Sequence, residues 1–113
     1  MSFFSSLFGS STSKSDVIKL LSSEEFKTQV ENKKVQLVDV RTYKEFNGGH
    51  IKGAKNIDFF SGKFKAEFDK LNKDKALYIY CRSGGRSRQA SKKLEAIGFT
   101  EIYDLKGGIL KYK

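Results

Sequence analysis

The stretch "ALYIYCRSGGRSRQASKKLEAIG" (76–98) joins an apolar run, a glycine-rich segment and a longer run of helix-forming residues. Residues 76–80 are aliphatic or aromatic, which predicts a strand. Beyond the glycines, Ala90, Leu94 and Ile97 have the spacing of one helical face, and Gly98 stands where a glycine commonly ends a helix. Cys81, the single cysteine of the chain, falls where the strand ends. It is either a reactive thiol or a small buried apolar residue.

The rest of the chain continues this alternation of strands and helices. Helix starts are predicted at two capping-box spacings, Ser22 to Glu25 and Thr42 to Glu45, and a third helix carries Phe64, Phe68 and Leu71 and ends near residues 72–75. Short strands are predicted at 16–21, 35–40, 54–58, 76–80 and 101–105. This order predicts an α/β fold of three layers, α/β/α, with a small, mainly parallel sheet of about five strands. The site of such a fold lies at the carboxyl ends of its strands, where Asp39 and Cys81 fall.

The length of 113 residues suits one domain. Residues 1–15, rich in Ser, Thr and Gly, are expected to form a flexible leader before a domain at 16–113. No stretch reads as a secretory signal or a membrane span, so we expect a cytoplasmic protein. A peripheral membrane tether is a weaker alternative, and it would use Phe3, Phe4, Leu7 and Phe8.

The formal net charge is +9, with lysines scattered through the sequence. This charge attracts anions, and its scatter favours small anions over nucleic acid as partners. One cysteine and one histidine exclude an internal disulfide framework and a cysteine-based zinc cage, so no metal site is expected.

The residues after Cys81 favour the reactive thiol. A thiol ordinarily ionises with a pKa of about 8.5, and a helix N-terminus or a nearby arginine lowers that value. Gly84 and Gly85 permit a loop that turns its backbone N–H groups inward, and Ser87 is predicted as the N-cap of the following helix. Arg82 and Arg86 can hold an oxyanion. The glycines lack the spacing of a dinucleotide or P-loop fingerprint.

Three motifs resemble those of a single-domain rhodanese, a sulfurtransferase: "LVDVRTYKEFNGGHIKGAKNI", "YIYCRSGGRS" and "GFTEIYDLKGGI". The resemblance covers about residue 17 to residue 113 and implies a persulfide on Cys81, with no cofactor. It implies that a small anionic sulfur donor such as thiosulfate binds at the loop formed by Arg82, Ser83, Gly84, Gly85, Arg86 and Ser87. Because the chain has no second cysteine, the acceptor must be external: cyanide, a thiol or a sulfur-acceptor protein.

Two positions depart from the family pattern: Lys52 stands where proline is usual, and "LKYK" follows "GGI" where tryptophan is common. We expect neither position to touch the loop. Two alternatives to an independent sulfurtransferase remain. One is a relay module that passes sulfur only to a protein partner. The other is a phosphatase or arsenate reductase, although the ring from Cys81 to Arg86 is one residue shorter than the loop of cysteine phosphatases.

Several polar residues outside the loop are expected to be structural. Asp39, Arg41 and Glu45 read as an ion-pair and capping network, with Asp39 and Arg41 also candidates to support the loop from behind. His50 is expected to hydrogen-bond its own turn. Tyr78 and Tyr80 should pack beneath a helix, and Gly107 and Gly108 form a turn whose missing β-carbons permit close approach to the site.

Overall fold

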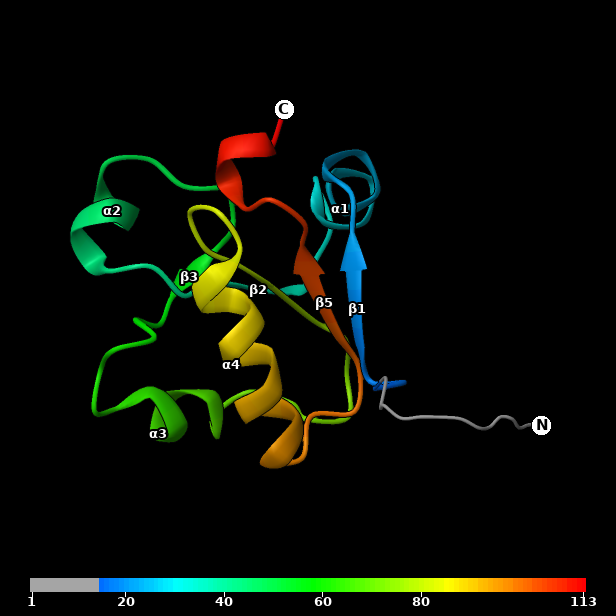
Figure 1. The fold of residues 1–113 in the computed structure, drawn as a ribbon, viewed down its shortest axis with the longest axis vertical. Coiled ribbons are helices and arrows are strands. Elements are labelled where there is room, and N and C mark those ends of the chain that lie inside the picture. Colours follow the sequence, from blue (N-terminus) through cyan, green and yellow to red (C-terminus); the bar gives the residue numbers. More distant parts are fainter. Residues whose placement is uncertain (1–14) are drawn as a thin grey trace.

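The computed structural model describes residues 15–113, which fold as alternating strands and helices (Figure 1). The predicted leader therefore lies, except for Ser15, outside the described residues, as does the proposed tether. The strands are β1 (Ile18–Leu21), β2 (Gln36–Asp39), β3 (Lys55–Asn56), β4 (Leu77–Tyr80) and β5 (Ile102–Leu105). The helices are α1 (Ser23–Val30), α2 (Tyr43–Asn47), α3 (Phe64–Phe68) and α4 (Gly85–Ala96), followed by a 3-10 turn, η1 (Ile109–Lys111).

The five strands form one sheet in the order β1-β5-β4-β2-β3, and every neighbouring pair is parallel. This confirms the predicted α/β fold with a parallel sheet of five strands. Strand β4 is central and all four of its residues are buried, as expected for a strand covered on both faces. The carboxyl ends of β2 and β4 therefore lie side by side, with Asp39 paired to Tyr80 in the register.

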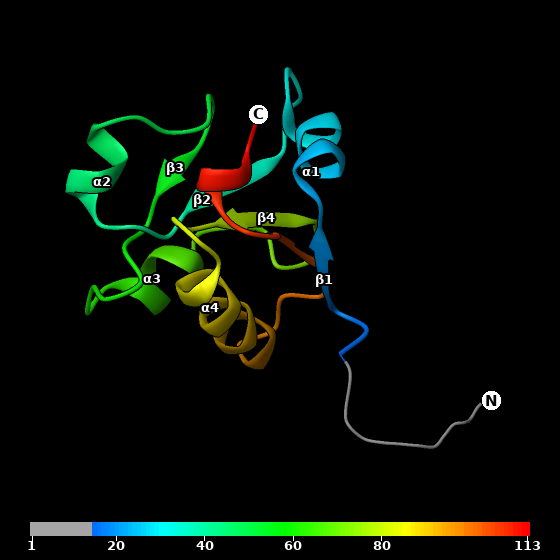
Figure 2. The same cartoon turned by 45° about the horizontal axis from the view of Figure 1, so that its top comes forward.

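Helices cover both faces of the sheet, giving the predicted three layers (Figures 1 and 2). Helices α3 and α4 lie on one face, where Phe64, Phe68, Ala90 and Leu94 pack against apolar strand residues and Cys81. Helix α1 lies on the other face, and its Phe26 contacts Tyr78 and Tyr80 edge to face. The expectation that these tyrosines pack beneath a helix is confirmed.

Both predicted capping boxes are present. The hydroxyl of Ser22 accepts from the N–H of Glu25, the hydroxyl of Thr42 accepts from the N–H of Glu45, and each glutamate accepts from the N–H of its cap residue. Gly98 ends α4 with φ of 111°. Together with the bonds from Gly98 N–H to the Glu95 carbonyl and from Phe99 N–H to the Leu94 carbonyl, this is a Schellman motif.

Two helix boundaries were predicted wrongly. Helix α4 begins at Gly85 with Gly84 as its N-cap, so Ser87 lies inside the first turn and is not the cap. Helix α3 ends at Phe68 instead of near residues 72–75. The side-chain oxygen of Gln36 accepts from the N–H of Asn72 at 2.7 Å, which draws this segment out of the helix. No helix within residues 15–113 is long and apolar enough to cross a membrane.

Candidate functional site

The loop between β4 and α4 surrounds the sulfur of Cys81. Gly84 has φ of 109°, a left-handed conformation that glycine adopts without steric cost, and this turn directs backbone N–H groups back toward the strand end. The Cys81 sulfur accepts a hydrogen bond from the N–H of Gly84 at 3.0 Å and another from the N–H of Ser87 at 3.4 Å. Cys81 is 1% exposed. The sulfur thus lies at a helix N-terminus, a setting that stabilises negative charge.

The C-terminal segment supports the loop from behind. The N–H of Ile109 donates to the Cys81 carbonyl at 2.9 Å, and the N–H of Leu110 donates to the Arg82 carbonyl at 3.1 Å. The expectation that the segment "LKYK" does not touch the loop was therefore wrong. Gly108 lies against the loop backbone, because a β-carbon there would collide with the Arg82 carbonyl group and come within 2.6 Å of the Ser83 nitrogen. The predicted close approach of the Gly107–Gly108 turn to the site is confirmed.

Arg86 is held by helix α2. Its two terminal nitrogens donate to the two carboxylate oxygens of Glu45, at 2.7 and 3.0 Å. Glu45 also accepts from the N–H and the hydroxyl of Thr42, so one carboxylate both caps α2 and binds the loop. Hydrogen bonding to Arg86 lowers the pKa of Glu45 to about 2, and the same bond raises the pKa of Arg86. No local sequence pattern indicates this ion pair, since the partners are 41 residues apart.

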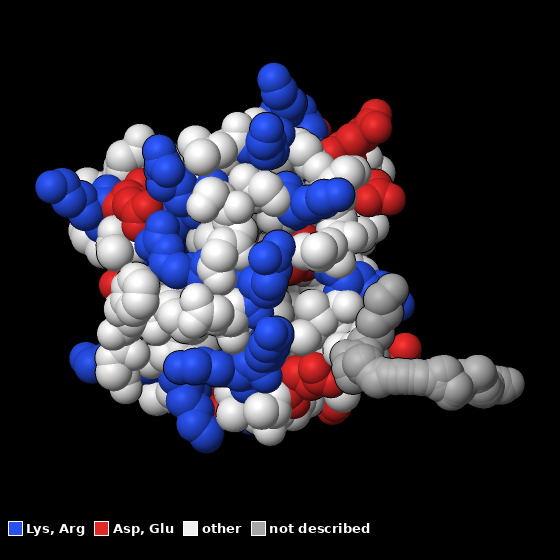
Figure 3. All heavy atoms as spheres, in the orientation of Figure 1, with Lys and Arg blue, Asp and Glu red and all other residues white. Residues whose placement is uncertain are grey.

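Arg82 and Ser83, unlike Arg86, are exposed at the outer side of the loop. Within residues 15–113, the guanidinium of Arg82 has no hydrogen-bond or ion-pair partner, so it is open to an anion. Within the loop, Gly85 is exposed, whereas Gly84 and Ser87 are buried. On the face of the molecule that Figure 3 shows, lysine and arginine side chains are distributed widely, and acidic side chains occur in fewer places.

Asp39 and Arg41 form a buried brace beside the loop. The Nε of Arg41 donates to both Asp39 carboxylate oxygens at 3.0 and 2.9 Å, and its Nη2 reaches Oδ2 at 2.7 Å and the Gly49 carbonyl at 2.7 Å. Asp39 pairs in register with Tyr80, and Cys81, the next residue, packs on the other face of the sheet. Asp39 and Arg41 therefore hold the turn after β2, and neither makes a hydrogen bond to the Cys81 loop.

His50 is bound within its own turn. Its Nδ1 lies 2.9 Å from the Phe46 carbonyl, and its ring stacks on Phe46 with 3.7 Å between ring centroids. The structural interpretation of His50 is confirmed.

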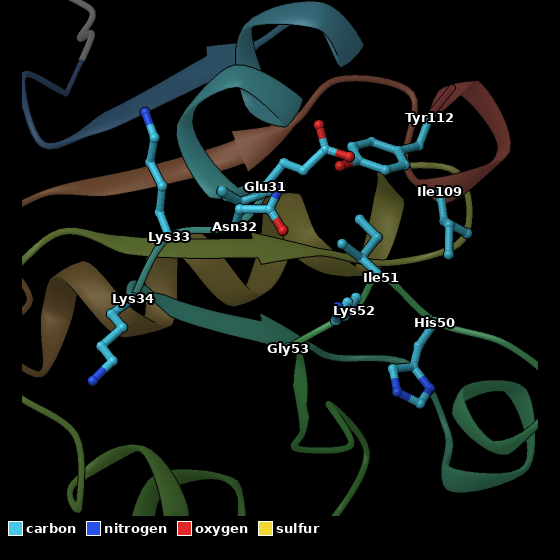
Figure 4. A pocket seen from close by; sticks show the side chains of 11 residues that line it. Glu31, Asn32, Lys33, Lys34, His50, Ile51, Lys52, Gly53, Ile109 and Tyr112 are labelled. Carbon is cyan, nitrogen blue, oxygen red and sulfur yellow. The ribbon is translucent and has the colours of Figure 1, made fainter.

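A cavity of about 580 Å³ is shown in Figure 4, and neither Cys81 nor residues 82–86 line it. It is lined by the last residue of α1 and the segment 31–34 that follows, by the segment 50–53, and by Ile109 and Tyr112 near the C-terminus. The ring of Tyr112 also contacts Phe26 of α1. Ile109, which hydrogen-bonds the Cys81 carbonyl, is shared by this cavity and by the support of the loop.

Asp104, within the strand predicted at 101–105, is a buried residue near the site. It is 1% exposed on β5 and lies beside Ile79 of β4 in the register. Alternation along the strand places Asp104 on the same face as Ile102, which is fully buried. This alternation is the feature of the sequence that could have indicated a buried carboxyl group, although the prediction did not use it.

The comparisons with known proteins agree with the motifs. A family model described as "Rhodanese-like domain" matches residues 22–113. "Uncharacterized protein YqhL" of Bacillus subtilis is 43% identical over 96 residues, which cover 85% of this chain and 73% of that protein. A solved structure of a rhodanese-like domain protein from Staphylococcus aureus superposes with a TM-score of 0.73 at 33% identity, covering 84% of this chain and 91% of the other.

Two longer relatives carry functional names. A tRNA uridine(34) hydroxylase of Buchnera aphidicola is 32% identical over 81% of this chain. The adenylyltransferase and sulfurtransferase UBA4 of Candida albicans is also 32% identical over 81% of this chain. The match spans only 31% of the first protein and 23% of the second, so the similarity concerns one part of each.

Proposed function

Because the chain belongs to the rhodanese-like domain family, we propose that it is a sulfurtransferase that carries sulfur as a persulfide on Cys81. The observation that supports this most directly is the pair of N–H groups, from Gly84 and Ser87, that donate to the Cys81 sulfur. Such donors stabilise a thiolate, which is the nucleophilic form of cysteine. In a persulfide the negative charge lies on the outer sulfur, and we expect the backbone N–H groups of loop residues 82–86 to stabilise it.

The first half of the reaction loads the cysteine. Thiosulfate, a dianion, is attracted by the exposed guanidinium of Arg82 at the outer side of the loop. The Cys81 thiolate attacks the outer sulfur of thiosulfate and forms a new sulfur–sulfur bond. The bond between the two sulfurs of thiosulfate breaks, and sulfite leaves with that electron pair. Cys81 then carries one additional sulfur with a negative charge.

The second half of the reaction transfers the sulfur from Cys81 to an acceptor. An external nucleophile, either a thiolate or cyanide, attacks the outer sulfur of the persulfide, and Cys81 leaves as a thiolate. The chain contains no other cysteine that could take the sulfur instead. Because the donor product departs before the acceptor reacts, the kinetics should be of the ping-pong type.

Arg86 has a positioning role in this scheme. Its guanidinium is already paired through both terminal nitrogens with Glu45, so it holds the loop to α2 while Arg82 meets the anion. The same reasoning assigns Asp39 and Arg41 to support of the turn after β2 and not to contact with the sulfur donor.

The experiment that tests the proposal is the intact mass of the protein after brief incubation with thiosulfate. We expect a gain of one sulfur atom that cyanide removes, and no gain in the Cys81→Ser variant. If neither thiosulfate nor another persulfide donor adds sulfur, the proposal is wrong. Release of phosphate from an aryl phosphate by the natural protein, but not by the serine variant, would indicate a phosphatase instead.

A relay module that serves one protein partner is the second candidate function. It is favoured by two large exposed side chains, Tyr43 at 66% and Leu110 at 57% exposure. Tyr43 lies on α2, which holds Arg86, and Leu110 donates its N–H to the loop carbonyl of Arg82. Exposed apolar groups next to a site are typical of protein contacts. Slow discharge of the loaded protein by cyanide and small thiols would favour this candidate.

A further inference from the structure

The cavity of Figure 4 adjoins a second cavity, and the reaction proposed above uses neither of them. The second cavity has a volume of about 760 Å³, and Lys33, Lys34 and Gly53 line both. We call the two cavities together the basic groove. A site for a single small molecule usually has a volume of about 300–1,000 Å³, so two adjoining cavities of this size have room for a longer occupant.

Positive charge lines the basic groove. Lys33, Lys34, Lys52 and Lys75 are exposed along it, and Lys52 is one of the two departures from the family pattern. Within residues 15–113, none of these four lysines forms an ion pair with a carboxylate. Glu31 is the one acidic residue among the described residues that line the groove. The groove is therefore complementary to a ligand with several negative charges.

The first cavity, that of Figure 4, also has an apolar lining. The side chains of Val30 and Ile51 are buried, and those of Ile109 and Tyr112 are half-buried. A ligand that carried only charge would gain nothing from contact with these side chains. We therefore expect the occupant to combine negative charge with an aliphatic or aromatic group that leaves water when it enters the first cavity.

Hydrogen bonds hold the walls of the groove in place. The N–H of Lys33 donates to the Val30 carbonyl at 3.3 Å, and the N–H of Ala54 donates to the Ile51 carbonyl at 3.0 Å. These bonds close the two turns that carry Lys33 and Lys52. Because the groove is already formed in the free protein, little conformational freedom is lost when a ligand binds.

An acidic protein segment fits the groove better than a nucleic acid does. The described residues that line the two cavities include no arginine. The rings of His50 and Tyr112 line the first cavity, but they already pack against Phe46 and Phe26. Sites for single-stranded nucleic acid commonly offer free aromatic rings and arginine for stacking on bases.

The groove is connected to the Cys81 loop through the C-terminal segment. Ile109 lines the first cavity, and its N–H donates to the Cys81 carbonyl. The next residue, Leu110, is exposed and donates its N–H to the Arg82 carbonyl. A protein bound in the groove would therefore contact the segment that supports the loop. A donor as small as thiosulfate needs no such groove, whereas an acceptor protein could use it.

We propose that the basic groove binds an acidic segment of a partner protein. An aliphatic or aromatic side chain of that segment occupies the first cavity, and its carboxylates pair with the four lysines. The role of this partner as the sulfur acceptor rests on the function proposed above.

The binding test uses a short synthetic peptide of Asp and Glu around a central Phe, and it measures affinity by isothermal titration calorimetry. Lys33→Glu combined with Lys52→Glu should weaken binding roughly tenfold or more. Lys19→Glu combined with Lys92→Glu is the matched control, because it changes the net charge equally at exposed positions on β1 and α4, and it should weaken binding less than about threefold. Replacing the Phe of the peptide by Gly should weaken binding roughly tenfold, because the burial of an aromatic side chain is lost.

Several results would overturn the proposal. They are the absence of binding, equal weakening by the two pairs of substitutions, and equal affinity of the Phe and Gly peptides. If 4-phenylbutyrate binds as tightly as the peptide, the occupant is a small anion and the proposal is wrong. If a short polyuridine RNA binds more tightly than the peptide and depends on Lys33 and Lys52, the groove serves a nucleic acid instead.

A second experiment tests the acceptor role. The same peptide, with a cysteine attached through a flexible linker, should discharge the persulfide of the loaded protein roughly tenfold faster than a peptide with Asn and Gln in place of its acids. The variant with Lys33→Glu and Lys52→Glu should lose this difference, and the control pair should keep it. Equal discharge rates for the two peptides would refute the acceptor role. Peptide binding itself needs no sulfur transfer. A protein that binds the peptide but never accepts sulfur would therefore support the groove and refute only the sulfurtransferase function.

Discussion

The backbone of Gly108 lies against the Arg82 carbonyl and has φ of 67°. A side chain at this position meets two obstacles, a left-handed backbone conformation and a collision with backbone atoms that cannot rotate away. We predict that Gly108→Ala lowers the free energy of unfolding by about 2–4 kcal/mol and slows alkylation of Cys81. Urea denaturation and iodoacetamide kinetics measure the two effects.

Gly62→Ala is the control for this change. Gly62 has no positive φ, and a β-carbon there would meet no atom within 4 Å, so we expect a change within about 0.5 kcal/mol. Equal stability of Gly108→Ala and Gly62→Ala would show that the C-terminal segment does not fix the loop.

At the scale of single residues, the sequence predicted those functional residues that a local pattern of neighbours marks. Cys81 is recognisable because a strand pattern, two glycines and two arginines surround it within a few positions. Asp104 was overlooked because an acidic residue in a short strand is ordinarily read as an exposed one. The Glu45–Arg86 pair was overlooked for another reason: the fold, and not the local sequence, brings those side chains together.

Helix α2 is attached to the loop mainly by a single carboxylate, that of Glu45. The side chains of Glu45 and Arg86 are 27% and 20% exposed, so this pair is shielded from water better than a typical surface ion pair. We predict that Glu45→Gln lowers the free energy of unfolding at pH 7 by about 1–2 kcal/mol, because glutamine keeps the cap but loses the charge that binds Arg86. Denaturation of both proteins at several pH values measures the difference.

The pH dependence of this difference follows from the pKa of Glu45, about 2 in the folded protein against a usual value of 4.5. The stabilisation is complete above the usual value and is lost as the pH falls through about 2. Glu25→Gln is the matched control, because Glu25 fills the same capping position in α1 without an arginine partner. If both variants lose the same stability at pH 7, the Arg86 bond contributes nothing.

At the scale of elements, the sequence predicted the two capping boxes correctly but did not predict the geometry of the loop before α4. The Ser–Glu and Thr–Glu spacings predicted the starts of α1 and α2 correctly, since each box is a local interaction. The start of α4 was predicted wrongly because the prediction assumed a serine cap at Ser87. The actual N-cap is Gly84, which has a left-handed conformation and makes no side-chain hydrogen bond to the helix. The end of α3 depends on Gln36, which is distant in sequence.

The whole molecule combines a dispersed positive charge with a deeply buried sulfur. Pattern alone predicted a parallel sheet, but it could not give the strand order in which β5 lies between β1 and β4. That order places the C-terminal segment behind the loop, where Ile109 binds the Cys81 carbonyl. The net charge of +9 comes from side chains on many elements, so it should act on an anionic donor as a diffuse field rather than as a binding patch.

This description predicts a specific dependence on salt. Raising the ionic strength from about 0.01 M to about 0.5 M shortens the screening length severalfold, so loading of Cys81 by the thiosulfate dianion should slow several-fold. Alkylation by iodoacetamide, which is uncharged, should keep its rate. Arg82→Gln should slow loading roughly tenfold at low salt, because it removes a direct contact with the anion. Lys19→Gln on β1 changes the net charge equally, two strands away from β4, and should have little effect. Equal slowing of loading and alkylation by salt would instead indicate a change in the loop itself.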